Sequence, residues 1–168
     1  MHVLITGAPG AGKSTLIRRV LAELKCPVFG FETAKEAPLP GGEGCPILLR
    51  TPDRSLSLTA GRADRRLLEV RKESFDLFAT HLLSPMPERG ILLMDELGIM
   101  ESVSPDFCAA VLSRLDGSTP VLAAVKDKAH PFLDAVRAHP NCCLFRLTAD
   151  NREALFGEVL AFLREQLP

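Results

Sequence analysis

A glycine-rich stretch near the amino end, Gly7 to Ser14, constrains the fold of this chain more than any other part of its sequence. It reads GAPGAGKS and fits the pattern G-x-x-x-x-G-K-[ST]. The apolar run at residues 2–6 predicts a strand before it, and Leu16, Val20 and Leu24 recur at helical spacing after it. A turn that merely packs a helix on a strand is the alternative explanation. Because both flanking elements are present, we interpret the stretch as a phosphate-binding loop, or P-loop.

The residue types of this loop suit phosphate chemistry. Glycines let the backbone turn tightly and approach an anion without a Cβ in the way, so that successive N–H groups and the helix N-terminus face one phosphate. Lys13 would reach the β- and γ-phosphates of a nucleotide as a point charge, and the Ser14 hydroxyl would bind Mg²⁺. The sequence therefore predicts a site for a nucleoside triphosphate and its magnesium ion.

A second informative stretch ends in the paired acids Asp95 and Glu96. The apolar residues 91–94 directly before them predict a strand that is buried on both faces, in the manner of a Walker B strand. At its end Asp95 would hold Mg²⁺ opposite Ser14, directly or through water. Glu96 would orient or deprotonate the water that attacks the γ-phosphate. An ordinary acidic strand terminus is the alternative explanation for both acids.

Strand and helix patterns alternate along nearly the whole chain. They predict a single domain over residues 1–168 with the three-layer α/β/α sandwich of P-loop NTPases, in which a mostly parallel sheet carries an inserted β-hairpin. Further strands are expected at 28–33, 47–49, 56–58, 120–125 and 142–148, and helices at 74–83, 105–116, 131–138 and from 150 onward. Asp150 to Glu153 resembles a capping box that opens the last helix.

In a parallel sheet, ligands bind at the edge where the strands have their carboxyl ends. Topology alone would gather the P-loop, the two acids, Lys126 and residues 148–152 at this edge. Lys126 is either a sensor of the γ-phosphate or part of a solvated turn. Glu101 is either a second carboxylate facing the water or metal, or an acid that stabilises a helix dipole.

The sequence specifies the residues that recognise the nucleotide base less clearly than those that bind phosphate and metal. Asn151 and Arg152 would hold a base through an amide edge and a stacked guanidinium, or simply begin the last helix. The motif N-K-x-D is absent, so a guanine-specific GTPase lacks its usual support. Residues 62–72 alternate in charge, which is typical of a solvated face, although one of their arginines could instead swing over the nucleotide.

Composition narrows the class of protein. The chain has 20 basic and 21 acidic residues, and its net charge of −1 does not suggest nucleic acid as a partner. Its five cysteines lack C-x-x-C spacing, which favours reduced thiols in a cytoplasmic protein over a zinc site. The first strand begins without a leader, and no run reaches the roughly 18 apolar residues of a membrane span. We therefore expect a soluble, cytoplasmic protein.

Four motifs together resemble the THEP1-type nucleoside-triphosphatases. They are the P-loop, GFET at 30–33, DELGIME at 95–101 and TADNRE at 148–153. The resemblance spans almost all of the chain, and its last two motifs are more specific than the P-loop. It implies a small P-loop protein that uses Mg²⁺ to hydrolyse ATP, GTP and other nucleoside triphosphates to the diphosphate and phosphate, slowly and with little base preference.

Carried over position by position, the resemblance assigns roles to particular residues. Asp95 serves the metal, Glu96 is the general base, and Asn151 and Arg152 lie near the base of the nucleotide. The residues that would hold the phosphates are Gly7, Ala8, Pro9, Gly10, Ala11, Gly12, Lys13, Ser14 and Thr15.

The resemblance breaks off after the GFET motif. The family pattern continues with x-E-V-R and a short glycine-rich turn, where this chain has AKEAP at 34–38. The arginine is therefore missing, and the glutamate is absent or displaced to Glu36. If that arm brings a cation to the triphosphate, turnover is slower here, or Arg62, Arg65 or Arg66 substitutes for the missing arginine.

Two other functions stay open from the sequence. A kinase for a small molecule or nucleotide would use the same P-loop with an acceptor pocket and a lid, which residues 34–72 could form. A nucleotide-gated switch or adaptor would turn over little alone and would accelerate with a protein partner. The Pro- and Gly-rich stretch 37–44, expected to be an exposed loop, is where such a partner would act.

Overall fold

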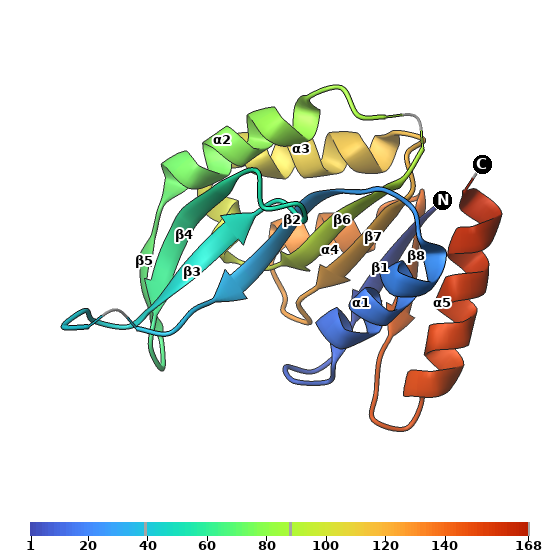
Figure 1. Cartoon of the computed structure of the whole chain (residues 1–168), viewed down its shortest axis with the longest axis horizontal. Coiled ribbons are helices and arrows are strands. Elements are labelled where there is room, and N and C mark those ends of the chain that lie inside the picture. Colours follow the sequence, from blue (N-terminus) through green and yellow to red (C-terminus); the bar gives the residue numbers. More distant parts are fainter. Residues whose placement is uncertain (39, 88, 168) are drawn as a thin grey trace.

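The computed structural model describes residues 1–38, 40–87 and 89–167, which form one mixed sheet with helices on both faces (Figure 1). The strands are β1 (His2–Thr6), β2 (Val28–Lys35), β3 (Cys45–Arg50), β4 (Ser57–Ala63), β5 (Leu67–Val70), β6 (Ile91–Leu97), β7 (Val121–Val125) and β8 (Cys142–Arg146). The helices are α1 (Lys13–Leu24), α2 (Lys72–Leu83), α3 (Pro105–Asp116), α4 (Pro131–Arg137) and α5 (Arg152–Gln166), with a short 3₁₀ helix, η1 (Met100–Val103).

The sheet has eight strands in the order β5-β4-β3-β2-β6-β7-β1-β8. The adjacent strands β2, β6, β7, β1 and β8 are parallel to one another. Beyond β2, the strands β3, β4 and β5 extend the sheet as an antiparallel meander. The predicted α/β fold, a mostly parallel sheet with an inserted hairpin, is confirmed. The hairpin is one strand longer than predicted, because β5 lies inside the charged stretch 62–72, where exposed Arg65, Arg66 and Arg71 hide the strand pattern.

Alternating side chains of the central strands build two separate cores. On one face Leu92 and Met94 of β6 lie in the same cluster as Phe75 of α2 and Phe107 of α3. On the other face Leu93 lies in a cluster with the buried residues of α1 and α5. Figure 1 shows α2 and α3 along one face of the sheet and α1 beside α5. Because helices cover both faces, β6 is apolar at successive positions, as its sequence predicted.

The carboxyl ends of the parallel strands meet at one edge of the sheet, the lower edge in Figure 1. The P-loop follows β1 at this edge, Asp95 and Glu96 lie near the end of β6, Lys126 follows β7, and residues 148–152 follow β8. The predicted gathering of these segments at one edge is confirmed.

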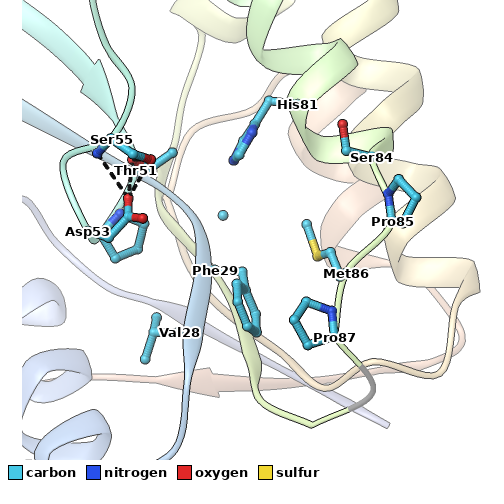
Figure 2. A pocket seen from close by; sticks show the side chains of 12 residues that line it. Val28, Phe29, Thr51, Asp53, Ser55, His81, Ser84, Pro85, Met86 and Pro87 are labelled. Atoms are coloured by element: carbon cyan, nitrogen blue, oxygen red, sulfur yellow. Dashed lines mark hydrogen bonds between the residues drawn. The ribbon is translucent and has the colours of Figure 1, made fainter.

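A pocket of about 110 Å³ lies at the opposite edge, between the start of β2, the β3–β4 turn and the end of α2 (Figure 2). Phe29, Asp53, His81 and Met86 are among its lining residues. Because the amino ends of the parallel strands face this side, the pocket is remote from the P-loop. The candidate active site is therefore the carboxyl edge and not this pocket.

The helix ends agree with the sequence at α3 but not at α5. Ser104 caps α3 by accepting a hydrogen bond from the Phe107 N–H, and Gly117 follows the last turn, as predicted. The predicted capping box at α5 is wrong, because Asn151 is the N-cap residue and makes no side-chain cap. Its amide instead binds the backbone of the segment that precedes the helix.

Two further findings concern the cysteines and the helices. Cys26, Cys45, Cys108, Cys142 and Cys143 are all free thiols, in agreement with the predicted reduced state. Across residues 1–38, 40–87 and 89–167, no helix has both the length and the apolar character that crossing a membrane requires.

Gly30 in β2 is a position at which the sheet requires glycine. Its φ is 94°, and a Cβ built on it would lie 2.1 Å from the Leu93 carbonyl oxygen. We expect Gly30→Ala to lower the free energy of unfolding by at least about 2 kcal/mol in chemical denaturation. Gly157 in α5 has open space around it, so Gly157→Ala should raise this free energy by up to about 1 kcal/mol. Wild-type stability of Gly30→Ala would contradict the close approach of the two backbones.

Candidate active site

The P-loop forms the tight turn that its glycines predicted. Gly10 and Gly12 have φ values of 76° and 99°, which residues with a Cβ rarely adopt. Gly12 directly precedes α1 and supplies no side-chain cap, so the N–H groups of the first helical turn are available to an anion. A Cβ on Gly7 would lie 2.5 Å from the Leu147 carbonyl oxygen, so the loop also packs closely against the segment after β8.

Lys13 lies across the base of this loop and is only 7% exposed. Its ammonium donates a hydrogen bond to the Gly7 carbonyl oxygen at 3.2 Å and forms an ion pair with Glu96 Oε2, also at 3.2 Å. These oxygens compensate the cost of burying a positive charge. The phosphate-binding lysine and the predicted base are therefore direct neighbours.

Ser14 and Asp95 are also in contact. The Ser14 hydroxyl donates a hydrogen bond to Asp95 Oδ1 at 2.9 Å, although the two residues are 81 positions apart. Burial raises the pKa of Asp95, while the hydrogen bond from Ser14 lowers it. A hydroxyl and a carboxylate from two different elements form the kind of hard oxygen pair that Mg²⁺ prefers.

Glu96 stands between lysines from two parts of the chain. Its side chain is 25% exposed, with Lys13 Nζ near Oε2 and Lys126 Nζ 3.6 Å from Oε1. This contact brings Lys126 into the site, which favours the first of its two sequence interpretations. Glu96 is held in place by opposite charge on both of its oxygens.

Glu101 is buried, and its carboxyl group binds the turn that follows Glu96. It is 3% exposed, so it is not a surface acid near the start of α3, and Oε2 accepts a hydrogen bond from the Gly98 N–H at 2.9 Å. Burial raises the pKa of Glu101 to about 7. Nothing in the sequence signals this burial, because Glu101 lies among residues that resemble an exposed loop.

The loops after β7 and β8 form the side of the site next to the P-loop. The Asn151 amide accepts a hydrogen bond from the Thr148 N–H and donates one to the Arg146 carbonyl oxygen. Arg152 is exposed at the start of α5. Arg146, at the end of β8, forms a bidentate ion pair with Asp127 in the loop after β7, with distances of 2.6 and 3.3 Å. Sequence reasoning missed this ion pair.

Two further arginines pair with Glu32, on the strand next to Asp95, and sequence reasoning missed both. Arg50 Nε is 2.9 Å from Glu32 Oε1, and Arg54 pairs with the same carboxylate. The Cα of Glu32 is the register partner of the Cα of Asp95 on the neighbouring strand, so this cluster borders the site. The register of the β2–β3 pair, which the sequence does not give, is what places Arg50 opposite Glu32.

The arginines considered from the sequence lie elsewhere. Arg62 in β4 donates a hydrogen bond to the Glu43 carbonyl oxygen, in the extended β2–β3 connection. Arg65 and Arg66 are exposed between β4 and β5, at the outer end of the sheet. The structure therefore does not bring these three residues together with Lys13 and Asp95.

Comparisons with known proteins agree with this geometry. The family model NTPase_1, described as NTPase, matches residues 2–45 and 53–160. The chain is 31% identical over 175 residues to the nucleoside-triphosphatase THEP1 of Thermotoga maritima. This alignment covers 98% of the chain and 96% of the relative. It is 30% identical over 190 residues to the cancer-related nucleoside-triphosphatase homolog of Mus musculus, with 97% and 96% covered.

Solved structures give the same result for the fold. The solution structure of a human cancer-related nucleoside triphosphatase has a TM-score of 0.75 and 26% identity, covering 98% of this chain and 97% of its own. The crystal structure of THEP1 from Aquifex aeolicus, at 23% identity, also has a TM-score of 0.75. On the family model and on relatives of about 30% identity over nearly the full length, this chain belongs to the THEP1 family of nucleoside-triphosphatases.

Proposed function

We propose that this nucleoside-triphosphatase uses Mg²⁺ to hydrolyse ATP, GTP and other nucleoside triphosphates, with Glu96 as the general base and Lys13 as the cation on the phosphates. The observation that carries the proposal is the convergence of four side chains from the P-loop and β6. Ser14 contacts Asp95, and Lys13 contacts Glu96, so the residues proposed to bind phosphate, metal and water lie side by side.

The donor set fits the metal. Ser14 Oγ and Asp95 Oδ1 are adjacent oxygens at the helix N-terminus, and Mg²⁺ commonly binds through one or two protein oxygens together with substrate phosphates and water. Ser14 and Asp95 would hold the ion, and once bound it would neutralise charge on the β- and γ-phosphates.

Substrate binding would also change the partners of Lys13. A triphosphate in the P-loop offers this ammonium more negative charge than the Gly7 carbonyl and the single Glu96 carboxylate, which it contacts in the structure. When Lys13 turns to the phosphates, Glu96 Oε2 loses that ion pair and becomes a stronger proton acceptor. The carboxylate can then take a proton from water during in-line attack on the γ-phosphate.

The residues next to the P-loop suggest why base preference would be low. Asn151 is engaged with its own loop, whereas exposed Arg152 offers a flat guanidinium that stacks on any base. We assign Asn151 to shaping this loop and Arg152 to contact with the base.

The family pattern has an arginine after the GFET motif that this chain lacks, and we propose that Arg50 or Arg54 supplies its positive charge. Arg50 and Arg54 share the Glu32 carboxylate one strand from Asp95, so either guanidinium would exchange Glu32 for a phosphate oxygen as negative charge develops. A cytoplasmic location and a protein partner at the 37–44 loop stay predictions, and residue 39 of that loop lies outside the described residues.

Replacing the proposed base separates binding from chemistry. Glu96→Gln keeps the shape of the side chain but removes its basicity, so kcat should fall at least about 100-fold. Nucleotide affinity should be kept or slightly raised, because Lys13 no longer has to leave an ion pair. Phosphate release and equilibrium titration with a non-hydrolysable triphosphate measure the two effects. Unchanged turnover would end the assignment of Glu96 as the base.

Replacing the P-loop lysine should affect both quantities. Lys13→Ala removes the cation on the phosphates, and we expect kcat/KM to fall at least about 100-fold together with a weaker nucleotide Kd. Lys72→Ala is a matched control, because Lys72 is exposed and pairs with Asp76 within α2. If Lys13→Ala bound and turned over nucleotide as Lys72→Ala does, the P-loop would not be the phosphate site.

Asp95 is tested through the metal. In Asp95→Asn the Mg²⁺ concentration that gives half-maximal turnover should rise at least about tenfold, because a neutral amide is a poorer ligand than a carboxylate. Asp116→Asn, at an exposed position at the end of α3 where the carboxylate faces His139, controls for loss of a carboxylate away from the site. A titration of activity with Mg²⁺ measures both variants, and overlapping curves would remove Asp95 from the metal site.

A further inference from the structure

Glu101 is a buried carboxyl group that the proposed reaction does not use. It belongs to η1, which connects the end of β6 with α3, and only 3% of the residue is exposed. Carboxyl groups are rarely buried to this extent without a partner of opposite charge, because burial removes their hydration. Its neighbours therefore indicate what the group does.

The first neighbour is the backbone directly after the proposed base. Glu101 Oε2 accepts a hydrogen bond from the Gly98 N–H at 2.9 Å, which fixes the turn two residues after Glu96. A Cβ built on Gly98 would lie 3.3 Å from Glu101 Oε2 and 3.1 Å from Lys126 Cδ. The Gly98 position is thus enclosed by the carboxyl group and the Lys126 side chain.

The second neighbour is Lys126 itself. Its ammonium lies 3.6 Å from Glu96 Oε1, and the same side chain packs beside Gly98 together with the Glu101 carboxyl group. The Lys126 side chain is 49% exposed, so packing does not fix its ammonium on Glu96. Lys126 therefore links the buried acid to the proposed base.

We propose that Glu101 is a positioning residue for Glu96, which fixes the turn after the base through Gly98 and competes with the base for Lys126. When Glu101 is ionised, it draws Lys126 away from Glu96 and leaves the base less neutralised. When Glu101 is protonated, Lys126 pairs with Glu96 alone and weakens it as a proton acceptor. This inference rests on the proposed role of Glu96.

The surrounding charges give the direction of the pH effect. Burial raises the pKa of Glu101 to about 7, Lys126 lowers it and Glu96 raises it. On the side of α3, the Cys108 thiol contacts the Glu101 carbonyl oxygen, and burial raises the pKa of this thiol to about 11, so it stays neutral. Because Glu101 ionises as pH rises through neutrality, turnover should rise over the same interval.

The test is the pH profile of kcat at saturating nucleotide and Mg²⁺. A glutamine at this position can still accept the hydrogen bond from Gly98 but cannot ionise. We expect Glu101→Gln to turn over about tenfold more slowly than wild type at pH 8.5 and within about twofold of it at pH 6. Glu73→Gln, an exposed position on α2, should follow the wild-type profile. A Glu101→Gln profile parallel to wild type would overturn the inference.

A double-mutant cycle tests the route through Lys126. If Glu101 acts by competing for this lysine, Lys126→Met should remove the neutral pH step, and adding Glu101→Gln should change kcat less than about twofold further. If the two substitutions lowered kcat independently, so that their fold-effects multiplied, the route through Lys126 would be contradicted. Lys126→Met also keeps the proposal testable if Glu101→Gln folds poorly, since a half-exposed side chain tolerates replacement. If Glu101→Gln folds poorly, a Lys126→Met protein that keeps the neutral pH step in kcat would overturn the proposal.

A measurement without substrate separates this inference from the proposed function. The melting temperature of the wild type should fall between pH 5 and pH 8, because ionising a buried carboxyl group favours the unfolded chain, and this fall should be smaller in Glu101→Gln. If Glu96→Gln keeps full turnover, the proposed base fails and this inference fails with it. If Glu96→Gln is inactive but the Glu101→Gln kinetic profile matches wild type, only the positioning role fails.

Discussion

The hydrogen bond between Ser14 and Asp95 is the contact on which the rest of the site depends. It joins the first turn of α1 to the end of β6. In the sheet, β7 lies between β6 and β1, the strand that leads into the P-loop. These side chains meet only because β1, β7 and β6 are parallel and end at the same edge of the sheet. The crossover connections that make a sheet parallel are therefore also what assembles the site.

Around this contact, the site is organised by charge. Glu96 lies between Lys13 and Lys126, and the buried Glu101 stands behind the turn that follows it. In a partly buried environment such ion pairs are stronger than in water, so exchanging one partner changes the basicity of the group that is left. We propose that the substrate rearranges these pairs when it binds.

Much of this arrangement could be predicted from the sequence. The P-loop and the β6 acids were found because glycine spacing and a run of apolar residues are local patterns, and parallel topology then places them together. The α5 cap was predicted wrongly, because the Asn151 side chain binds backbone ahead of the helix and not its first turn.

Other features depend on tertiary structure, which no local pattern reports. Arg50 and Arg54 reach Glu32 only through the register of the β2–β3 pair, and Glu101 is buried only because η1 folds under α3. Strand β5 was missed because its four residues are flanked by arginines. These are the places where pairing and packing, and not the composition of a segment, decide the outcome.

The short β5 has a consequence for how molecules of this protein behave toward one another. It is an outer strand of the sheet, where unpaired backbone groups would otherwise recruit a strand from a second molecule. Four residues offer little backbone for such pairing, and the exposed charged side chains of Arg65, Arg66 and Arg71 at its ends disfavour the approach of a second strand. The same arginines that obscure the strand in the sequence thus protect this border of the sheet against aggregation.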